Sequence, residues 1–508
     1  VVEITAEGTG PASEKPALYL DGGIHSGELT ASQVGLYTVG QLLVRYGRDA
    51  DVTELLEQFA FYIRPKFNPD GSDLALLHDQ NLRSTVRPWD EDGDGAADED
   101  PPEDLDGDGW ITTMRIPDPE GEWHAHPQDD RVMVRGRGGV PDGAARYRVV
   151  QEGIDNDGDG RTNEDGIGGI DMNRNFPRNW ERVHLQNGAG PFPLSEPETY
   201  ATVRFIQDHP NITAVVHGHT SGGFVYRLPS ASPPSRFPSE DLALIEHLGS
   251  AYTESTGRPV RASATHPTRH RYGTLMSWAY WDQGIVGWVP EYSPGPEAWV
   301  TDLDDDGTIG PLEEIRFNDR ELGGRYFSPW TAFQHPELGA VEIGGWHRKF
   351  WGQNPPAEFL EEECAAQIPW IVHLLRQSPR LALEGPEVIP LPDGAYRIRV
   401  TATNEGFLPT SLTGRGAVGR EGPDEGLRDQ VVRPPTLELH LDGAVLREGG
   451  KRVLIRHLKG TGPFLPGVGS TRATVEWVVE PLGSSAYVQV TARSDKAGVV
   501  RSRRIEVR

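Results

Sequence analysis

Short apolar runs alternate with segments of helical periodicity through most of the chain. The run Ala17–Leu20 ends in Asp21-Gly22-Gly23, which is typical of a buried strand that continues into a loop. Further strands are expected at about 59–63, 214–219 and 284–290, and helices at about 27–46, 200–208 and 239–256. This alternation predicts an α/β domain with a mixed, largely parallel central sheet flanked by helices.

The hydrophobic pattern changes after Pro379. A helix rich in Glu and Ala is expected over roughly 356–377 and closes the first region. Beyond Ala395, apolar and polar residues alternate with a period of two in four segments separated by Gly and Pro turns, at 396–403, 436–441, 474–479 and 486–492. This pattern predicts a C-terminal all-β sandwich. We therefore divide the chain into two domains, residues 1–383 and residues 392–508, with the boundary in the stretch between them.

Composition and charge narrow the class of protein. The 508 residues are 36% hydrophobic and 25% charged, and no apolar run reaches the roughly 18 residues of a membrane span. The net charge is −27, but 22 acidic residues lie in the short segments 90–108, 155–165 and 302–314. The charge therefore belongs to particular loops, and such an acidic chain is not expected to bind nucleic acid.

The only cysteine is Cys364, so the sequence excludes an intrachain disulfide and a cysteine-based metal site. The chain begins with Val1 rather than Met, and we expect an N-terminal piece to precede it. The lack of a signal peptide in these residues consequently says nothing about export.

Two short motifs contain groups that bind metals. His25 and Glu28 follow the first strand, and functional residues of an α/β sheet commonly lie in the loops after its strands. A His and a Glu at this spacing can bind one Zn²⁺ ion together. On its own this pair is weak, because a His and a Glu three residues apart occur often by chance. His217 and His219 lie two apart on a predicted strand and face the same side. Either histidine can complete a zinc site of two His and one Glu that leaves a fourth position for water. The other histidine would then pack against the ligating one or orient it.

Two further motifs offer groups that act on a substrate. Asn173 and Arg174 present an amide and a planar guanidinium suited to gripping a carboxylate, although a turn cap with a surface salt bridge gives the same pattern. Glu291 ends an apolar strand and, partly desolvated, can serve as general base. Glu342 also ends an apolar strand and is a rival base.

These motifs resemble a known family. The segments 23–28, 171–175 and 219–221 and the residue Glu291 are similar, in this order, to motifs of the carboxypeptidase A/B-type zinc carboxypeptidases. The segments 68–71 and 195–199 also resemble signatures of that family. The resemblance covers roughly residues 1–380 and implies the zinc carboxypeptidase fold, with its usual opening strand and helix missing before Val1.

The resemblance also implies roles for individual residues. One catalytic Zn²⁺ would be held by three ligands, His25, Glu28 and His219. Glu291 would be the general base, and Asn173 and Arg174 would bind the terminal carboxylate of the substrate. Arg115, within the segment 113–117, matches the family's arginine that stabilises the oxyanion.

Two expectations concern the substrate's side chain. The family's substrate-covering tyrosine has no clean match, but Tyr272 is nearby and offset. Met276 falls where the floor of the family's side-chain pocket lies. An uncharged residue there favours apolar C-terminal residues over Lys or Arg.

The acidic segments follow one form, in which three carboxylates at positions 1, 3 and 5 precede a glycine, as at the start of a calcium loop. The candidate calcium ligands are Asp90, Asp92, Asp94, Asp104, Asp106, Asp108, Asp155, Asp157, Asp159, Asp302, Asp304, Asp306 and, at position 12 of the last copy, Glu313. The earlier copies can close on Asp98, Asp100, Glu164 or Asp165 instead. Solvated acidic loops without an ion are the alternative. We hypothesise that Ca²⁺ orders the walls of the active-site cleft, which favours a secreted or periplasmic protein because cytosolic Ca²⁺ is scarce.

We therefore expect a zinc-dependent metallocarboxypeptidase that acts on peptides or proteins with a free C-terminal carboxylate. One alternative is a zinc amidohydrolase of the same fold that cuts amide bonds in cell-wall peptides or side-chain-linked amino acids. Another is a catalytically dead, calcium-dependent binding protein. The sequence does not indicate the oligomeric state.

Overall fold

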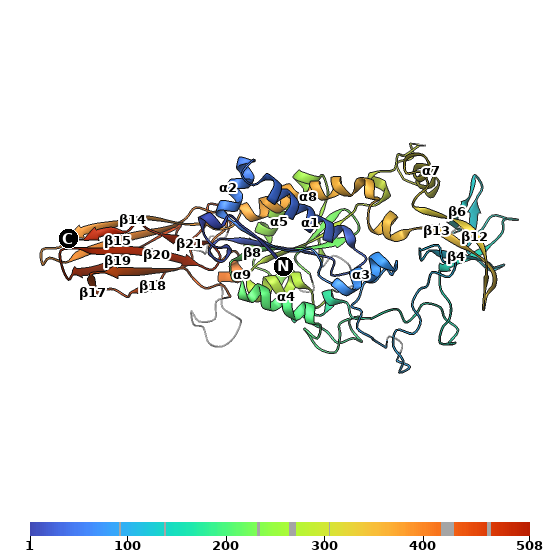
Figure 1. The fold of residues 1–508 in the computed structure, drawn as a ribbon, viewed down its shortest axis with the longest axis horizontal. Coiled ribbons are helices and arrows are strands. Elements are labelled where there is room, and N and C mark those ends of the chain that lie inside the picture. Colours follow the sequence, from blue (N-terminus) through green and yellow to red (C-terminus); the bar gives the residue numbers. More distant parts are fainter. Residues whose placement is uncertain are drawn as a thin grey trace.

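The computed structural model describes residues 1–90, 93–136, 139–230, 234–263, 271–303, 305–417, 431–464 and 469–507. The molecule is elongated, with an α/β body in the middle, a β domain at one end and a small sheet at the other (Figure 1). None of the described helices is both long and apolar enough to cross a membrane.

A seven-stranded sheet forms the centre of the α/β body. Its strands run, in spatial order, β1 (Val2–Ile4), β3 (Ala60–Arg64), β2 (Ala17–Gly22), β8 (Ile212–Thr220), β11 (Val286–Tyr292), β9 (Phe224–Arg227) and β10 (Val260–Ala262). Strands β3, β2, β8 and β11 are parallel to one another, and β1 is antiparallel to β3. Strand β9 is antiparallel to β11 and parallel to β10. The sheet is mixed and largely parallel, so the predicted fold class is confirmed.

Helices cover both faces of this sheet (Figure 1). They are α1 (Leu29–Arg45), α2 (Ala50–Gln58), α3 (Pro69–Leu77), α4 (Pro197–Asp208), α5 (Ser239–Thr256), α6 (Leu275–Gln283) and α8 (Ala357–Arg376). In α1 the buried positions recur at helical spacing, which places one face on the sheet. The indole of Trp288 in β11 meets Trp370 of α8 edge-on with ring centroids 5.6 Å apart, so the helix is fixed to the sheet by fully buried aromatic rings.

A second sheet lies at the end of the molecule opposite the β domain (Figure 1). Its order is β12 (Phe327–His335), β13 (Gly339–Trp346), β4 (Thr113–Pro117), β7 (Tyr147–Gln151), β5 (Trp123–His126) and β6 (Asp129–Arg135), with helix α7 (Pro311–Glu321) beside it. The sequence did not indicate this sheet, because most of its strands are only partly buried and they come from two distant parts of the chain.

The C-terminal β domain is the predicted all-β sandwich. One sheet contains β14 (Leu381–Pro390), β15 (Tyr396–Asn404), β19 (Arg472–Pro481) and β17 (Ala444–Glu448). The other contains β18 (Arg452–Leu454), β16 (Thr436–Asp442), β20 (Ala486–Ser494) and β21 (Gly498–Arg501), with β22 (Ile505–Val507) also paired to β20. Alternate residues of β20 are buried between the sheets, as the period-two pattern requires.

The first strand of the sandwich lies earlier than the sequence indicated. Strand β14 pairs with β15 from Leu381 onward, ahead of the 383–392 stretch expected to separate the domains. The register of this pair shifts between Glu384 and Glu387, at Gly385 and Pro386, which hides the period-two alternation there. The structure therefore favours a boundary near residue 380.

The sandwich packs against the α/β body at the start of β8. The ammonium group of Lys496 donates a hydrogen bond of 2.7 Å to the carbonyl oxygen of Ile212, and both residues are buried. Thr413, in the loop before the short helix α9 (Gly414–Ala417), donates from its hydroxyl to the carbonyl of Gly284 at 3.0 Å. The histidine motif lies at the other end of β8, so the sandwich supports the sheet from the end remote from that motif.

Candidate metal centre

The predicted metal ligands come from neighbouring strand ends. His25 follows β2, and Glu28 precedes α1 at its N-terminus. His219 lies in β8 beside β2, and Glu291 of β11 is its register partner on the other side. Because parallel strands end at the same edge of a sheet, four side chains far apart in the sequence meet there.

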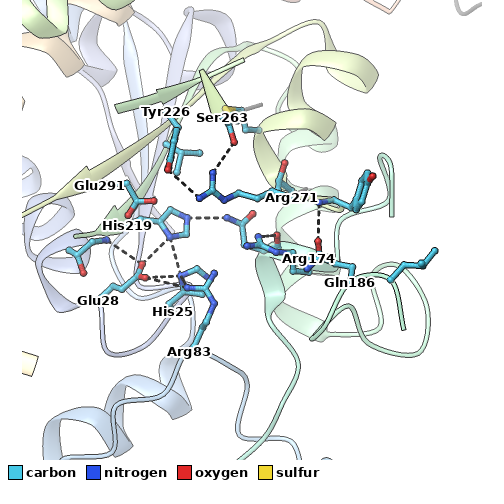
Figure 2. Close-up of a pocket in the computed structure, with 17 residues that line it drawn as sticks. His25, Glu28, Arg83, Arg174, Gln186, His219, Tyr226, Ser263, Arg271 and Glu291 are labelled. Atoms are coloured by element: carbon cyan, nitrogen blue, oxygen red, sulfur yellow. Dashed lines mark hydrogen bonds and ion pairs between the residues drawn. The ribbon is translucent and has the colours of Figure 1, made fainter. Parts of the chain in front are cut away.

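His25, Glu28 and His219 form a tight, buried triangle (Figure 2). The Nδ1 atom of His25 lies 2.9 Å from Oε1 of Glu28, and Nδ1 of His219 lies 2.9 Å from Oε2 of the same carboxylate. The two Nδ1 atoms are 3.1 Å apart. One donor atom from each residue consequently points to a common position.

Asp171 fixes the orientation of His25. Its Oδ1 atom lies 3.0 Å from Nε2 of the imidazole, and since an ionised carboxylate only accepts hydrogen bonds, this nitrogen carries the proton. In neutral His25 the Nδ1 atom therefore has no proton, and its lone pair faces Glu28 and His219. The lone pair of His25 Nδ1 and the carboxylate of Glu28 are both acceptors, so a cation bound between them would satisfy both.

The donor set fits zinc. A tetrahedral Zn²⁺ with ligands at 2.0–2.2 Å holds neighbouring ligand atoms about 3.3 Å apart, close to the three separations of the triangle. Burial lowers the pKa of His219 to about 3, so this imidazole is neutral, as a metal ligand must be. Although burial alone would raise it, the two imidazoles hold the pKa of Glu28 well below its usual range. Although burial opposes the shift, Glu28 and Asp171 raise the pKa of His25. When both imidazoles are neutral, as metal binding requires, the triangle offers two ring nitrogens and one carboxylate.

His217 does not join this triangle. Its Nδ1 atom lies 2.6 Å from Oδ1 of buried Asp21, and its ring packs edge-on against that of His219 with centroids 4.6 Å apart. Of the two histidines that the sequence left open, the structure brings His219 to His25 and Glu28.

The triangle forms one wall of a cavity of about 580 Å³ (Figure 2). Predicted substrate residues Asn173, Arg174, Tyr272 and Met276 line it together with Glu291. The lining also includes residues to which the sequence had given no role, namely Arg83, Leu185, Gln186, Thr220, Tyr226, Ser263, Arg271, Thr274 and Val289.

Asn173 and Arg174 belong to a short 3₁₀ turn, η3 (Met172–Arg174), that is held by Asp171. The carboxylate of Asp171 accepts a hydrogen bond of 2.8 Å from the backbone of Asn173. The side-chain amide of Asn173 lies 3.1 Å from Nε2 of His219. Burial, with the nearby guanidinium groups of Arg83 and Arg271, lowers the pKa of Arg174, although Asp171 opposes the shift. An anion bound beside Arg174 would relieve this concentration of positive charge.

Glu291 faces the cavity from the end of β11. Burial raises the pKa of its carboxyl group to about 8, and the carboxylate of Glu28 adds to the shift. A divalent cation at the triangle would act in the opposite direction. A raised pKa at a cavity wall is the environment expected of a group that accepts and returns a proton.

Arg115 and the rival base Glu342 lie elsewhere, which corrects the expectation for Arg115. They occupy paired positions on β4 and β13 of the second sheet, where Nε of Arg115 lies 2.7 Å from Oε2 of Glu342. The guanidinium of Arg115 also stacks on Trp330, with its carbon 4.7 Å from the ring centroid. Neither residue lines the cavity. Strand pairing holds both side chains in the second sheet, and they neutralise each other there.

Arg83, rather than Arg115, places a guanidinium beside the triangle. Its Nη2 atom lies 2.9 Å from Asp171, its Nη1 atom lies 3.8 Å from Glu28, and its side chain is half-exposed toward the cavity. The sequence around Arg83 contained no motif, so only its position in the chain between the motifs of Glu28 and Asp171 could have suggested a role.

The acidic loops share one pattern of hydrogen bonds between the first carboxylate and the backbone. The first Asp of each loop accepts hydrogen bonds from the backbone amides of the fourth and sixth residues, as in Asp90 with Gly93 and Gly95, Asp104 with Gly107 and Gly109, Asp155 with Gly158 and Gly160, and Asp302 with Asp305 and Gly307. Carboxylates converge in three groups, which are Asp104 with Asp106 and Asp108, Asp155 with Asp157 and Asp159, and Asp94 with Glu99 and Asp157. Asp92 and Asp304 lie outside the described residues.

Glu313, expected at position 12 of the last loop, is bound to the backbone. Its carboxylate accepts hydrogen bonds from the amides of Leu303 and Gly310, and it thereby caps the N-terminus of α7. It therefore links both ends of the loop to the helix that follows.

Comparisons with known protein families identify two regions. A family model described as zinc carboxypeptidase matches residues 1–100 and 140–310, which together are more than half of the chain. A second model, described as a domain of unknown function (DUF8731), matches residues 380–504. The first match contains the triangle, the cavity and Glu291, whereas the second coincides with the sandwich.

Among curated proteins, a metallocarboxypeptidase A-like protein of Trichophyton verrucosum is 23% identical over 321 residues, covering 61% of this chain and 56% of the relative. Metallocarboxypeptidase A of Trichophyton tonsurans is 36% identical over 81 residues, covering 16% of this chain and 19% of the relative. The chain thus spans about half the length of the first relative and far less of the second. Among solved structures, thrombin activatable fibrinolysis inhibitor is 16% identical over 71% of this chain and 61% of that chain, with a TM-score of 0.40.

Proposed function

Because this chain belongs to the zinc carboxypeptidase family, we propose that it is a metallocarboxypeptidase that hydrolyses the C-terminal bond of peptides or proteins with a free carboxylate. The observation that carries the proposal is the convergence of His25, Glu28 and His219 beside Glu291 in a cavity that also contains guanidinium groups. A hydrolase of this kind needs a metal-ligand set, a base and a carboxylate-binding group within one pocket.

The metal ligands and the residues beside them have separate tasks in this reaction. Zinc, when bound by His25, Glu28 and His219, polarises the scissile carbonyl and makes water more acidic. Glu291 takes the proton from the attacking water and passes it to the leaving amine. Asn173 and Arg174 hold the substrate's terminal carboxylate, so that the last peptide bond reaches the base.

Arg83 completes the arrangement as the cation that meets the negative charge developing on the carbonyl oxygen. Its guanidinium lies next to the ligand Glu28 and is anchored by Asp171, so it is held in place before the reaction begins. Donors that are fixed in this way stabilise the transition state because they need not reorganise during the reaction.

A pair of matched variants tests the proposal. Blocked dipeptides with a free C-terminal residue are incubated with the zinc-loaded protein, and the released amino acid is measured by mass spectrometry. Glu291→Gln should lower kcat by about 10²-fold or more, since the general base is lost. Glu342→Gln removes the rival carboxylate on the second sheet and should leave kcat within about threefold. The proposal would be contradicted if kcat fell equally in the two variants, or if the unaltered protein released no C-terminal amino acid from any peptide.

We also propose that the acidic loops bind Ca²⁺ and that the protein acts in a secreted or periplasmic setting. The hydrogen-bond pattern common to the loops and the convergence of carboxylates from two different loops at Asp94, Glu99 and Asp157 support calcium binding. Carboxylates that lie this close to one another repel each other unless a cation lies between them. The secreted or periplasmic location depends on this calcium proposal alone.

A further inference from the structure

Among the described residues that line the cavity, Arg271 is a cation that the proposed reaction does not use. Arg83 meets the carbonyl oxygen and Arg174 meets the terminal carboxylate, which leaves Arg271 without a task. Figure 2 shows its side chain reaching into the cavity toward Tyr226 and Ser263.

Arg271 is held by neutral groups. Its Nη2 atom donates to the hydroxyl of Tyr226 at 3.2 Å, and its Nη1 atom donates to the hydroxyl of Ser263 at 3.4 Å. The guanidinium also lies over the Tyr226 ring, with its carbon 4.6 Å from the ring centroid. These contacts fix the direction of the side chain and leave its positive charge in place.

Within the described part of the chain, no carboxylate forms an ion pair with Arg271, whereas Arg83 and Arg174 both face Asp171. A guanidinium that is oriented by hydroxyl groups, and that forms no ion pair with a carboxylate of the described residues, is arranged to receive an anion from outside.

The charges of the cavity indicate how many anionic groups a substrate brings. Among the described residues, three guanidinium groups line it, against the carboxylates of Glu28 and Glu291 and that of Asp171 beside Arg83 and Arg174. A zinc ion held by the triangle would add two further positive charges. The terminal carboxylate of a peptide offsets only one of the excess positive charges. A second carboxylate on the same residue would match the charge of Arg271.

We propose that Arg271 makes this cavity selective for peptides whose C-terminal residue carries a second carboxylate, as Asp and Glu do. The inference depends on the proposed carboxypeptidase function, because it names the C-terminal residues that the same site prefers. It also changes the preference expected from Met276. That residue and Val289 line the cavity and pack on the methylene groups of the side chain, while Arg271 binds its charged end.

The test compares side chains of nearly equal size. Blocked dipeptides that end in Glu, Gln, Leu or Lys are hydrolysed by the zinc-loaded protein, and kcat/KM is measured for each. We expect kcat/KM for the Glu peptide to exceed that for the Gln peptide by about 10- to 100-fold, because the Glu carboxylate can form a charge-assisted bidentate contact with Arg271. Lys should be the poorest substrate, because Arg271 repels it.

Variants separate the contribution of Arg271 from the general charge of the protein. Arg271→Gln should remove the preference for Glu over Gln, so that kcat/KM for these two peptides differs by less than about threefold. Arg271→Lys should retain part of the preference, since the charge remains without the planar fork. Arg182→Gln removes one positive charge from an exposed position outside the cavity lining and should leave the preference unchanged.

A binding measurement keeps the inference testable if a variant turns over poorly. Calorimetry with the zinc-loaded Glu291→Gln protein should give a Kd for free L-glutamate about 10-fold or more below that for L-glutamine, and the added Arg271→Gln change should abolish the difference. If Leu peptides are cut while Glu is not preferred, the inference on Arg271 is wrong and the carboxypeptidase function stands. If no peptide is cut at all, the proposed function itself fails.

Discussion

The Nε2 atom of His25 lies 3.0 Å from Oδ1 of Asp171, so a carboxylate from a distant segment sets the tautomer of the imidazole that faces Glu28. Such a partner orients a metal ligand and raises its basicity. We predict that Asp171→Ala lowers zinc affinity by about 10- to 100-fold. Competition with a zinc-binding dye measures the zinc affinity of each protein. Asp208→Ala, which removes an exposed carboxylate on α4, is the control, and equal zinc affinity in all three proteins would show that Asp171 has no such role.

The two arginines Arg83 and Arg115 give opposite predictions. Arg83→Gln should lower kcat by about 10²- to 10³-fold with a smaller change in KM, because its charge is needed mainly in the transition state. Arg115→Gln should keep kcat within about threefold and lower the melting temperature, because it leaves Glu342 without its partner. Zinc content is measured in both variants, since Arg83 also contacts Asp171. A large loss of kcat in Arg115→Gln alone would reverse our assignment.

Calcium should stabilise the protein independently of zinc. Metal-free protein is first loaded with one equivalent of Zn²⁺, and Ca²⁺ is then added during thermal unfolding. At a concentration of 100 times the Kd, a single site adds about 2.7 kcal/mol of stability, so we expect the melting temperature to rise by several degrees. Asp104→Asn together with Asp155→Asn should reduce this rise. A melting temperature that does not respond to Ca²⁺ would exclude the calcium proposal.

The ammonium group of Lys496, between the sandwich and β8, predicts a pH dependence of stability. Burial lowers its pKa to about 7, whereas the unfolded chain has the ordinary value near 10.5. Between these values the unfolded state binds more protons, so this residue's contribution makes stability rise with pH from about 7 to about 10.5. The total change is a few kcal/mol, because one pKa unit corresponds to about 1.36 kcal/mol.

Lys496→Met keeps the length of the side chain without the titrating group. Urea unfolding at several pH values should therefore show a flatter stability profile for the variant than for the unaltered protein above pH 7. Parallel profiles would mean that the ammonium group does not lose its proton in this range when the protein is folded.

The sequence predicts the parts of this structure that depend on local pattern. The central sheet, the helices that cover it and the sandwich follow from periodicity, and His25, Glu28 and Glu291 lie at the strand ends where such sheets gather functional groups. The residues that sequence reasoning missed act through distant contacts. Asp171 and Arg83 gain their roles only from proximity to His25 and Glu28, which no spacing in the chain reveals.

The position of Arg115 outside the cavity lining has the same cause. Its short motif resembled that of a catalytic arginine, but hydrogen bonding of β4 to β13 and β7 holds it in a sheet whose strands come from two distant parts of the chain. Non-local pairing of this kind leaves no periodic signal in the sequence. The register shift in β14 likewise hid the true start of the sandwich.

The most direct test of the central claim is a zinc titration of the metal-free protein. Release of the C-terminal residue from a blocked dipeptide is followed as Zn²⁺ is added in steps. Our account predicts that the rate rises linearly and levels off at one equivalent per chain, and that His219→Ala shows no rise over the same range. Full activity without zinc, or no activity at any zinc content in a folded protein that binds one equivalent, would contradict it.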